Sequence, residues 1–385
     1  MDNNKGELQF LPPQIRTRDQ AAMSHIDPVN MLNSVDIGLF EQGLGSIPGP
    51  WASNLLLDCA KAITEKEIEK VQQLLWMLNE LASPYGDCEQ RLASYFLQAL
   101  FCKMTETGPR CHKTLCAAAE RNCSFDLMRK MILKFQEASP WTTGRLCWKP
   151  WRPETTGTPN LRLTTVIVGS LNTNNSVTRE IGQRMEKFAR LMGVPFEYSV
   201  LYKEAEEELD LKRIELRTDE ALAINCVHSL QRLNHKDSVL AGIRNMNPKI
   251  VTVVEDEVDL ESGDFYEQFC ECHRFFTLYF DSLEESFGRT SNERLMVERQ
   301  VGRSLVNVLA CAENCERREK AAQWGKRLEG AGFEPWPLSD DGVDDVRALL
   351  KRYKEGWGLS SVNSQGLFLT WKEQCAVWAS AWKPK

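Results

Sequence analysis

Residues 248–257 read PKIVTVVEDE, and this stretch decides the predicted fold. Its core, residues 250–254, is almost entirely β-branched, and a run that is apolar on both faces is typical of a strand covered on both sides, as in a parallel sheet. Pro248 stops any helix before it. Glu255, Asp256 and Glu257 follow at the end where open α/β sheets place their crevices. They indicate either a site or an ordinary acidic loop, and the sequence leaves both open.

Strands and helices alternate on both sides of this run. Apolar patterns predict strands over residues 161–168, 195–202, 221–227, 333–338, 367–371 and 376–381, and helices over 176–192, 228–246, 265–287, 292–311, 317–330 and 343–355. Such alternation predicts an α/β core over residues 161–385 with a parallel, doubly wound sheet.

The N-terminal third of the chain has a different pattern. Residues 1–48 hold few regularly spaced apolar residues, and we predict a disordered tail. From Trp51 leucines recur at helical spacing, which predicts an α-helical cap over residues 49–141, with helices near 55–63, 68–78, 89–104, 115–120 and 125–137. Stripes of this kind usually pack inward, and the alternative is that part of one docks a partner helix.

Composition and charge limit the function classes. The chain is 42% hydrophobic and 26% charged, as in soluble globular proteins. It has no apolar run near the roughly 20 residues of a membrane helix and no signal-like start. Thirteen cysteines in this context indicate reduced thiols in the cytosol or nucleus. The net charge of −7 argues against a broad basic surface, so we expect DNA to be contacted only indirectly.

Six motifs in order resemble the plant GRAS family of transcriptional regulators, and most closely its SHORT-ROOT-like branch. They are LLLDCAKAI (55–63) with LASPYGDCEQRLASYFLQAL (81–100), RMEKFARLMGVPF (184–196), EALAINCV (220–227), PKIVTVVEDE (248–257), FFTLYFDSLEESF (275–287) with SNERLMVER (291–299) and ERRE (316–319), and WASAWKP (378–384). The first looks like the family's first leucine-rich region, and the last two look like its PFYRE and SAW regions. The resemblance covers residues 50–141 and 158–385.

The resemblance implies a methyltransferase-like α/β core with an N-terminal helical cap. It also implies a non-enzymatic transcriptional co-regulator, in nucleus and cytoplasm, that binds other GRAS proteins (SCARECROW-like) as a heterodimer and zinc-finger DNA-binding proteins, without a membrane or a cofactor. The candidate partner-binding residues are Trp51, Leu55, Leu75, Tyr85, Tyr95, Arg317, Arg318, Trp378 and Trp382. For Trp378 and Trp382, as for Trp371, a core position is the alternative to a binding role. For the arginine pair the alternative is a solvated helix face between Glu316 and Glu319.

Residues 142–160 depart from the resemblance. The family carries a helix and then a strand with the VHIID motif here, whereas residues 144–157 read GRLCWKPWRPETTG, without period or cap. A codon string for a family-like segment, read one nucleotide later, gives this sequence. We interpret it as a deletion or splice-junction error that ends in the wrong frame, which sequencing the transcript across the junction tests.

The junction predicts a sheet without its first strand, which in a doubly wound sheet lies at the centre. Losing about five buried apolar side chains, at about 1.5–3 kcal/mol each, would destabilise the core. The neighbouring strands then either pair across the gap or keep exposed edges. We expect an irregular junction and no cooperative unfolding at an ordinary temperature.

Two other functions remain as alternatives. One is a truncated, interaction-only variant that sequesters partners through its cap. The other is a vestigial S-adenosylmethionine-dependent methyltransferase-like enzyme, although no glycine-rich turn follows a strand. We predict no catalytic, cofactor-binding or metal-binding residues. The groups Cys270, Cys272, His273 and Cys111, His112, Cys116, Cys123 favour structural thiols over zinc, because neither has paired C-x-x-C spacing.

Overall fold

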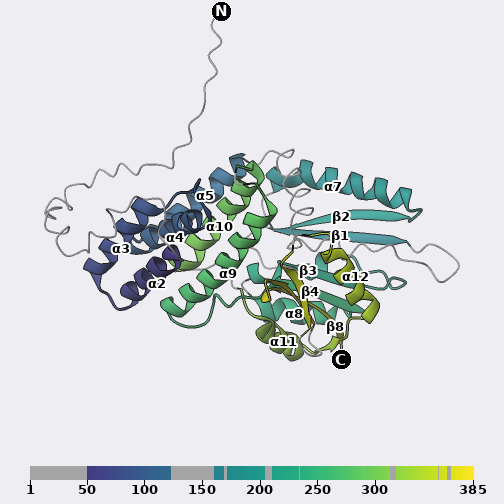
Figure 1. Ribbon diagram of the computed structural model, residues 1–385. Coiled ribbons are helices and arrows are strands. Elements are labelled where there is room, and N and C mark those ends of the chain that lie inside the picture. The colour runs from purple at the N-terminus through teal and green to yellow at the C-terminus, as the bar shows by residue number, and fades with distance from the viewer. Residues whose placement is uncertain are drawn as a thin grey trace, which may run out of the picture. The chain divides into compact units, whose positions relative to one another are not determined.

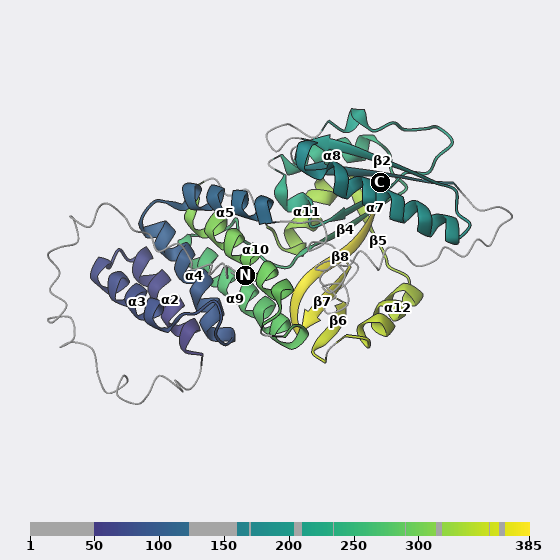
Figure 2. The same ribbon diagram turned by 90° about the horizontal axis from the view of Figure 1, so that it is seen from above.

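The computed structural model describes residues 50–122, 160–168, 171–203, 210–233, 235–288, 290–312, 318–353, 355–361 and 366–385 (Figures 1 and 2). The predicted tail over residues 1–48 and almost all of the predicted junction over 142–160 lie outside these ranges. The frame hypothesis, which concerns residues 144–157, therefore stays a prediction.

The beginning of the described chain is helical, as predicted. It forms α2 (Trp51–Thr64), α3 (Ile68–Leu81), α4 (Cys88–Met104) and α5 (Gly108–Asn122). These helices pack with two later ones, α9 (Phe265–Ser286) and α10 (Asn292–Ala310) (Figure 1). The start of α4 is fixed by a capping box, in which the Asp87 carboxylate accepts the Gln90 N–H and the Gln90 side chain accepts the Asp87 N–H.

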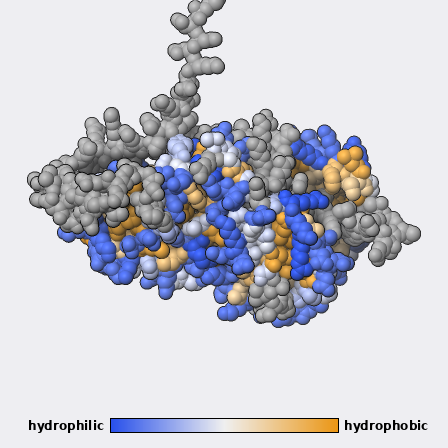
Figure 3. All heavy atoms as spheres, viewed as in Figure 1, coloured by the Kyte–Doolittle hydropathy of each residue, from blue (hydrophilic) through white to orange (hydrophobic). Residues whose placement is uncertain are grey.

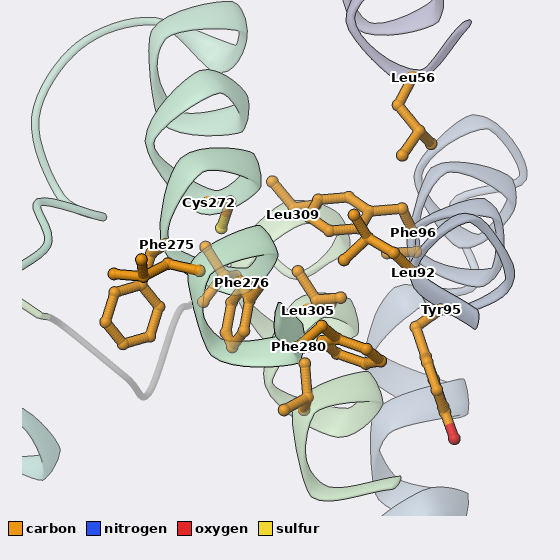
Figure 4. Packing of buried hydrophobic residues seen from close by; sticks show 14 of the residues in the cluster. Leu56, Leu92, Tyr95, Phe96, Cys272, Phe275, Phe276, Phe280, Leu305 and Leu309 are labelled. Carbon is orange, nitrogen blue, oxygen red and sulfur yellow. The ribbon is translucent and has the colours of Figure 1, made fainter. Parts of the chain in front are cut away.

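A single hydrophobic core joins α4 to α9 and α10 (Figure 4). The Phe96 ring lies 5.3 Å from that of Phe269, and the Tyr95 ring lies 5.8 Å from that of Phe280. Gly302 permits the close approach, because a Cβ at this position would lie 2.6 Å from Tyr95 Cδ1. The predicted cap therefore shares its core with helices that the sequence assigned to the α/β part.

The larger sheet is built around the stretch that opened the sequence analysis. Its strand order is β3 (Ala223–Val227), β4 (Ile250–Asp256), β8 (Gln374–Pro384), β7 (Leu367–Trp371) and β6 (Trp357–Ser361), with β5 (Phe333–Trp336) paired to β8. The strand β4 is buried on both faces, as predicted: Val253 belongs to a cluster with Trp382, and Val254 belongs to the core shared with α9. The prediction of a parallel sheet is wrong for this part: β4 runs parallel to β3, but β8 pairs antiparallel with β4, β5 and β7, and β6 pairs antiparallel with β7, so the sheet is mixed.

Three further helices accompany this sheet: α8 (Lys236–Asn245), α11 (Ala321–Gly330) and α12 (Asp340–Leu350). Hydrophobic residues of α8 and α11 pack with Val251 and Val253 of β4 in the second cluster. No helix in the described ranges is long and apolar enough to cross a membrane.

The strands β1 (Leu161–Val168) and β2 (Phe196–Lys203) form a separate, parallel, two-stranded sheet with α7 (Leu171–Leu191). The Thr178 and Tyr202 hydroxyl oxygens, 2.6 Å apart, join α7 to β2. Among the described residues, none from these three elements belongs to either hydrophobic core cluster. The sheet is thus divided between β1 and β3, which is one of the two outcomes expected when a central strand is missing.

Some element boundaries differ from the sequence predictions. The strand β6, with the sequence WGLSS, was not predicted because glycine and serine dilute its apolar pattern, and it forms by pairing with β7. The helix predicted over residues 228–246 consists of a 3₁₀ turn (Leu230–Arg232) followed by α8. The helix predicted from residue 317 begins at Ala321.

Candidate functional site

The exposed face of the helical part carries large apolar side chains. Ile68 and Tyr85 are 61% exposed and Trp76 is 53% exposed. Figure 3 shows orange surface between blue patches over the helical part of the chain. Tyr85 lies in the turn before α4, which is held by the capping box and by the Arg91 guanidinium that donates to the Gly86 carbonyl at 2.8 Å. Tyr85 therefore presents its ring from a turn that these hydrogen bonds hold in place, and exposed apolar groups of this kind are found at protein-binding surfaces.

The structure places the other candidate residues of the cap at different depths. Trp51, Leu55 and Leu75 are half-buried and pack against the core. Tyr95 is buried, with its ring against Phe280. Of the five cap candidates, only Tyr85 is mainly exposed. Ile68 and Trp76 were not predicted as partner-binding residues. Trp76 carries a signal that would find it, an apolar residue outside the inward stripe of its helix, whereas Ile68 belongs to the apolar pattern and is exposed at the first turn of α3.

Trp378 and Trp382 are core residues in this structure. They are 1% and 0% exposed, and their rings meet edge to face at 6.5 Å. Trp371 is also buried, and its indole N–H donates to Asp281 Oδ2 at 2.6 Å. The core position favoured by the sequence is confirmed for all three, and neither Trp378 nor Trp382 offers its ring to a partner here.

The predicted solvated face around Arg318 and Glu319 is wrong. Glu319 is buried, with Lys236 Nζ 2.6 Å from its Oε1 and Arg327 Nε 2.7 Å from its Oε2. The two residues precede α11 rather than lying on an exposed helix, and they tie this segment to α8 and to β4. Arg317 lies outside the described residues. Arg318 and Glu319 thus make structural contacts, and a partner role for Arg318 stays a prediction.

The acidic end of β4 forms a cluster of charged groups. Arg318 Nη1 lies 3.3 Å from Asp256 Oδ2, and His228 Nδ1 lies 3.4 Å from Asp256 Oδ1. The guanidinium also lies over the rings of Phe275 and Phe276, at 5.5 and 5.6 Å from their centres. Contacts of this kind between a cation and aromatic faces are favourable when desolvated. The cluster joins β4, the end of β3, α9 and the segment before α11.

Glu255 is the more deeply buried of the two acids at the end of β4. It is 1% exposed, and its Oε1 accepts the Leu230 N–H at 2.9 Å, whereas its Oε2 has no hydrogen-bond partner within the described chain. Burial raises the pKa of Glu255 to about 8, and repulsion from Asp256 adds to the effect. The carboxyl group is therefore protonated at neutral pH. The neutral carboxyl group has an O–H that can donate a hydrogen bond. Its Oε1, which accepts the Leu230 N–H, ties β4 to the 3₁₀ turn.

The Glu255→Gln variant should remove a pH dependence of stability. The pKa of Glu255 in the folded chain, about 8, lies above its ordinary value of 4.5. The contribution of the Glu255 carboxyl group to the free energy of unfolding is fully present below pH 4.5 and is lost as the pH rises to 8. The free energy of unfolding falls over this range by up to about 1.4 kcal/mol per pH unit. We expect Glu255→Gln to be more stable than the parent at pH 8, as measured by urea unfolding between pH 5 and 8.

The matched control for this experiment is Glu334→Gln, which changes an exposed carboxylate that pairs with Lys383 on the surface. Its unfolding free energy should follow that of the parent across the same pH range. Identical pH profiles for the parent and Glu255→Gln would show that Glu255 is ionised in the folded chain and would contradict the assignment.

The cysteine and histidine groups occupy structural positions. His273 is buried against Phe96, with the ring centres 5.7 Å apart, and burial lowers its pKa to about 4. Cys116 Sγ lies 3.6 Å from His112 Nε2 within α5, and Cys123 lies outside the described residues. No group of three or more metal-binding side chains occurs within the described ranges.

Comparisons with known proteins agree on one family. A family model described as "GRAS domain family" matches residues 52–144 and 151–383. Protein SHORT-ROOT of Arabidopsis thaliana is 44% identical to this chain over 87% of it and 73% of that protein. Scarecrow-like transcription factor PAT1 of the same plant is 26% identical, over 85% of this chain and 75% of that protein.

A solved structure has the same fold. The crystal structure of SCL7 from Oryza sativa aligns with a TM-score of 0.65 at 23% identity, covering 88% of this chain and all of that one. The predicted α/β fold class with its helical cap is confirmed by this likeness. The SHORT-ROOT alignment has 389 positions, more than the 87% of 385 residues it covers, so that relative carries residues that this chain lacks.

Proposed function

This chain belongs to the GRAS domain family, and we propose that it is a non-enzymatic transcriptional regulator of plant development that acts through contacts with other proteins. The relatives named SHORT-ROOT and Scarecrow-like transcription factor support this role. The observation that carries the proposal is the exposure of three large apolar side chains of the helical part, Ile68, Trp76 and Tyr85. Aromatic side chains on a rigid base are favoured anchors of protein interfaces.

The proposed partners are a second GRAS protein of the SCARECROW-like type, as a heterodimer, and zinc-finger DNA-binding proteins. The chain's net charge of −7 supports indirect rather than direct contact with DNA, since phosphate binding depends on clustered lysine and arginine. We propose that the protein works in the nucleus and has a second pool in the cytoplasm.

The Tyr85→Ala variant tests the cap surface. Binding of the full-length chain to an immobilised Scarecrow-like GRAS protein should weaken about tenfold, which corresponds to about 1.4 kcal/mol, because Tyr85 is an exposed aromatic anchor. Biolayer interferometry measures the affinity, and urea unfolding checks that stability is unchanged. The control is Trp336→Ala, which removes an exposed aromatic ring on β5, outside the cap. Equal losses in both variants, or none in Tyr85→Ala, would argue against the cap surface.

A second candidate function is an interaction-only variant that sequesters partners. The division of the sheet between β1 and β3 favours it, because a defective α/β part can coexist with an intact helical surface. A transcriptional reporter separates the two functions. A regulator raises or lowers reporter output with its partner present, whereas the interaction-only variant binds the partner and only opposes the partner's own effect.

A further inference from the structure

Two cysteine thiols meet where α4 turns into α5. Cys102 lies in the last turn of α4 and is buried, and Cys111 lies near the start of α5 and is half-buried. The Thr107 N–H donates to the Cys102 carbonyl at 3.0 Å, and the Thr107 carbonyl accepts the Cys111 N–H at 2.9 Å. The turn thus holds both residues through one intermediate, and their thiols, which are reduced, are in hydrogen-bonding contact. We call this pair the turn dithiol.

Neighbouring groups hold Cys111 in place. Gly108, one turn before it, lies so close to α10 that a Cβ there would clash with the Ala310 carbonyl. The Gln98 side-chain nitrogen, from α4, lies 4.0 Å from Cys111 Sγ. Cys311 follows Ala310 and lies near enough to act on the charge of Cys111. The start of α5 is therefore fixed between α4 and α10, which Figure 2 shows beside it, with a third thiol close by.

The contact between the two thiols makes Cys102 reactive. Hydrogen bonds from the Cys111 thiol and the Thr107 hydroxyl lower the pKa of Cys102 to about 7, against the opposing effect of burial. The same contact raises the pKa of Cys111, which stays protonated at neutral pH. The Cys102 sulfur also lies beside the first turn of α5, where the helix dipole favours negative charge. About half of Cys102 is therefore thiolate at pH 7, and the thiolate is the form that reacts with oxidants.

Other buried thiols of the described chain are not activated in this way. Burial raises the pKa of Cys59, Cys88 and Cys226 to about 12, because removal from water disfavours the thiolate. These thiols stay protonated and unreactive at neutral pH. Residues 103–107, by contrast, are all exposed, so a small oxidant from solvent has access to the turn that joins the dithiol.

We propose that Cys102 and Cys111 form a peroxide-sensitive dithiol, which hydrogen peroxide oxidises to an intramolecular disulfide across the turn between α4 and α5. In a compartment that keeps thiols reduced, such a bond is a transient, redox-sensing one. This inference does not depend on the proposed function.

The reaction has two steps. The Cys102 thiolate attacks one peroxide oxygen, the O–O bond breaks, and Cys102 becomes a sulfenic acid while the other oxygen leaves and takes up a proton as water. The Cys111 sulfur then attacks the Cys102 sulfur. The S–S bond forms, the S–O bond breaks, and the sulfenic oxygen leaves as a second water with the Cys111 proton. The two thiols lose two electrons, which the peroxide gains.

Peptide mass spectrometry on the full-length chain tests the bond. The chain is treated with an equimolar amount of hydrogen peroxide, its remaining thiols are blocked with N-ethylmaleimide, and it is digested without reductant. Trypsin separates the two cysteines, because Lys103 and Arg110 lie between them. We expect peptides 92–103 and 111–113 to become joined at least about ten times faster than any other cysteine is oxidised, because Cys102 has the thiolate and Cys111 is in contact with it. A reductant should separate the two peptides.

Two variants test the roles of the two cysteines. Cys111→Ser should stop the reaction at the Cys102 sulfenic acid, which dimedone traps. The matched control is Cys375→Ser, which removes a half-buried thiol on β8 and should form the linked peptides at the parent's rate. Urea midpoints close to that of the parent show that both variants fold. A Cys111→Ser chain without trapped sulfenic acid at Cys102 would contradict the first step.

The Thr107→Val variant tests the activation of Cys102. It removes one hydrogen-bond donor to the thiolate, so the pH profile of disulfide formation should move to higher pH, whereas Thr107→Ser should keep the parent's profile. Three outcomes would overturn the proposal. Linkage of peptide 111–113 to peptide 304–317 would make Cys311 the partner of Cys111. Equal oxidation of all cysteines, or an unchanged profile in Thr107→Val, would mean that the turn does not activate Cys102.

Discussion

Glu298→Gln is expected to destabilise the folded chain by about 3–5 kcal/mol, because it removes one partner of a buried ion-pair network. Glu298 is completely buried on α10. Arg91 Nη1, from α4, lies 2.9 Å from its Oε2, and Arg294 Nε lies 2.6 Å from its Oε1. Arg294 in turn lies 2.6 Å from Glu284 Oε2 of α9. A neutral amide would leave two buried guanidinium groups without a full counter-charge.

This effect is a large fraction of the total stability of a domain, which is about 5–15 kcal/mol. Urea unfolding followed by circular dichroism should show a lower midpoint at an unchanged slope. The matched control is Glu180→Gln on α7, whose i,i+4 pair with Arg184 is exposed to solvent. Exposed pairs contribute about 0–1 kcal/mol, so this control should stay close to the parent. A Glu298→Gln midpoint equal to the control's would mean that the network adds little to stability.

Trp382→Ala should also cost about 3–5 kcal/mol, because it empties the volume of a fully buried indole. The ring packs with Trp378 and Trp324 in the cluster beneath β4, and its N–H donates to Ser380 Oγ at 2.9 Å. Trp382 is also aligned with Val251 in the pairing of β8 with β4, so its loss weakens the strand that organises the sheet. The measurement is again the urea midpoint.

Trp336→Ala is the control that makes this test specific. It removes the same side chain from β5, where the ring is 46% exposed and lies 4.4 Å from Lys383 Nζ. Surface substitutions usually change stability by less than about 0.5 kcal/mol. A Trp382→Ala variant that kept its stability but lost affinity for a GRAS partner would return Trp382 to the partner-binding role first considered for it.

The stability of the α/β part depends on the contacts of β4 and β8, because β1 and β2 form a separate sheet. The β1, β2 and α7 elements add no residue to the two core clusters of the described chain. The core is therefore carried by β4, β8 and the helices packed on them. The midpoints predicted above require a cooperative urea transition of the parent chain. Such a transition would contradict the sequence-based prediction of a destabilised fold without cooperative unfolding, so the same experiments on the parent chain test that prediction.

The sequence alone determined the local elements and the fold class. The β-branched run of β4, the leucine stripes of the cap helices and the alternation of strands and helices are local patterns, and each forms nearly where it was predicted. The family resemblance carried by six motifs was confirmed, since motifs are also contiguous stretches. The acids at the end of β4 were recognised as a feature, although the burial of Glu255 and its raised pKa were not predicted.

Only the tertiary structure decided which distant residues meet. Arg91 and Glu298 are 207 positions apart, and Glu255 is kept neutral by burial among groups from other elements. The exposure of Tyr85 and the burial of Tyr95 depend on what packs against each helix, and so does the absence of pairing between β1 and β3 within the described ranges. Periodicity reports which face of an element is apolar, whereas long-range packing decides what that face contacts and how solvent and charge are distributed around it.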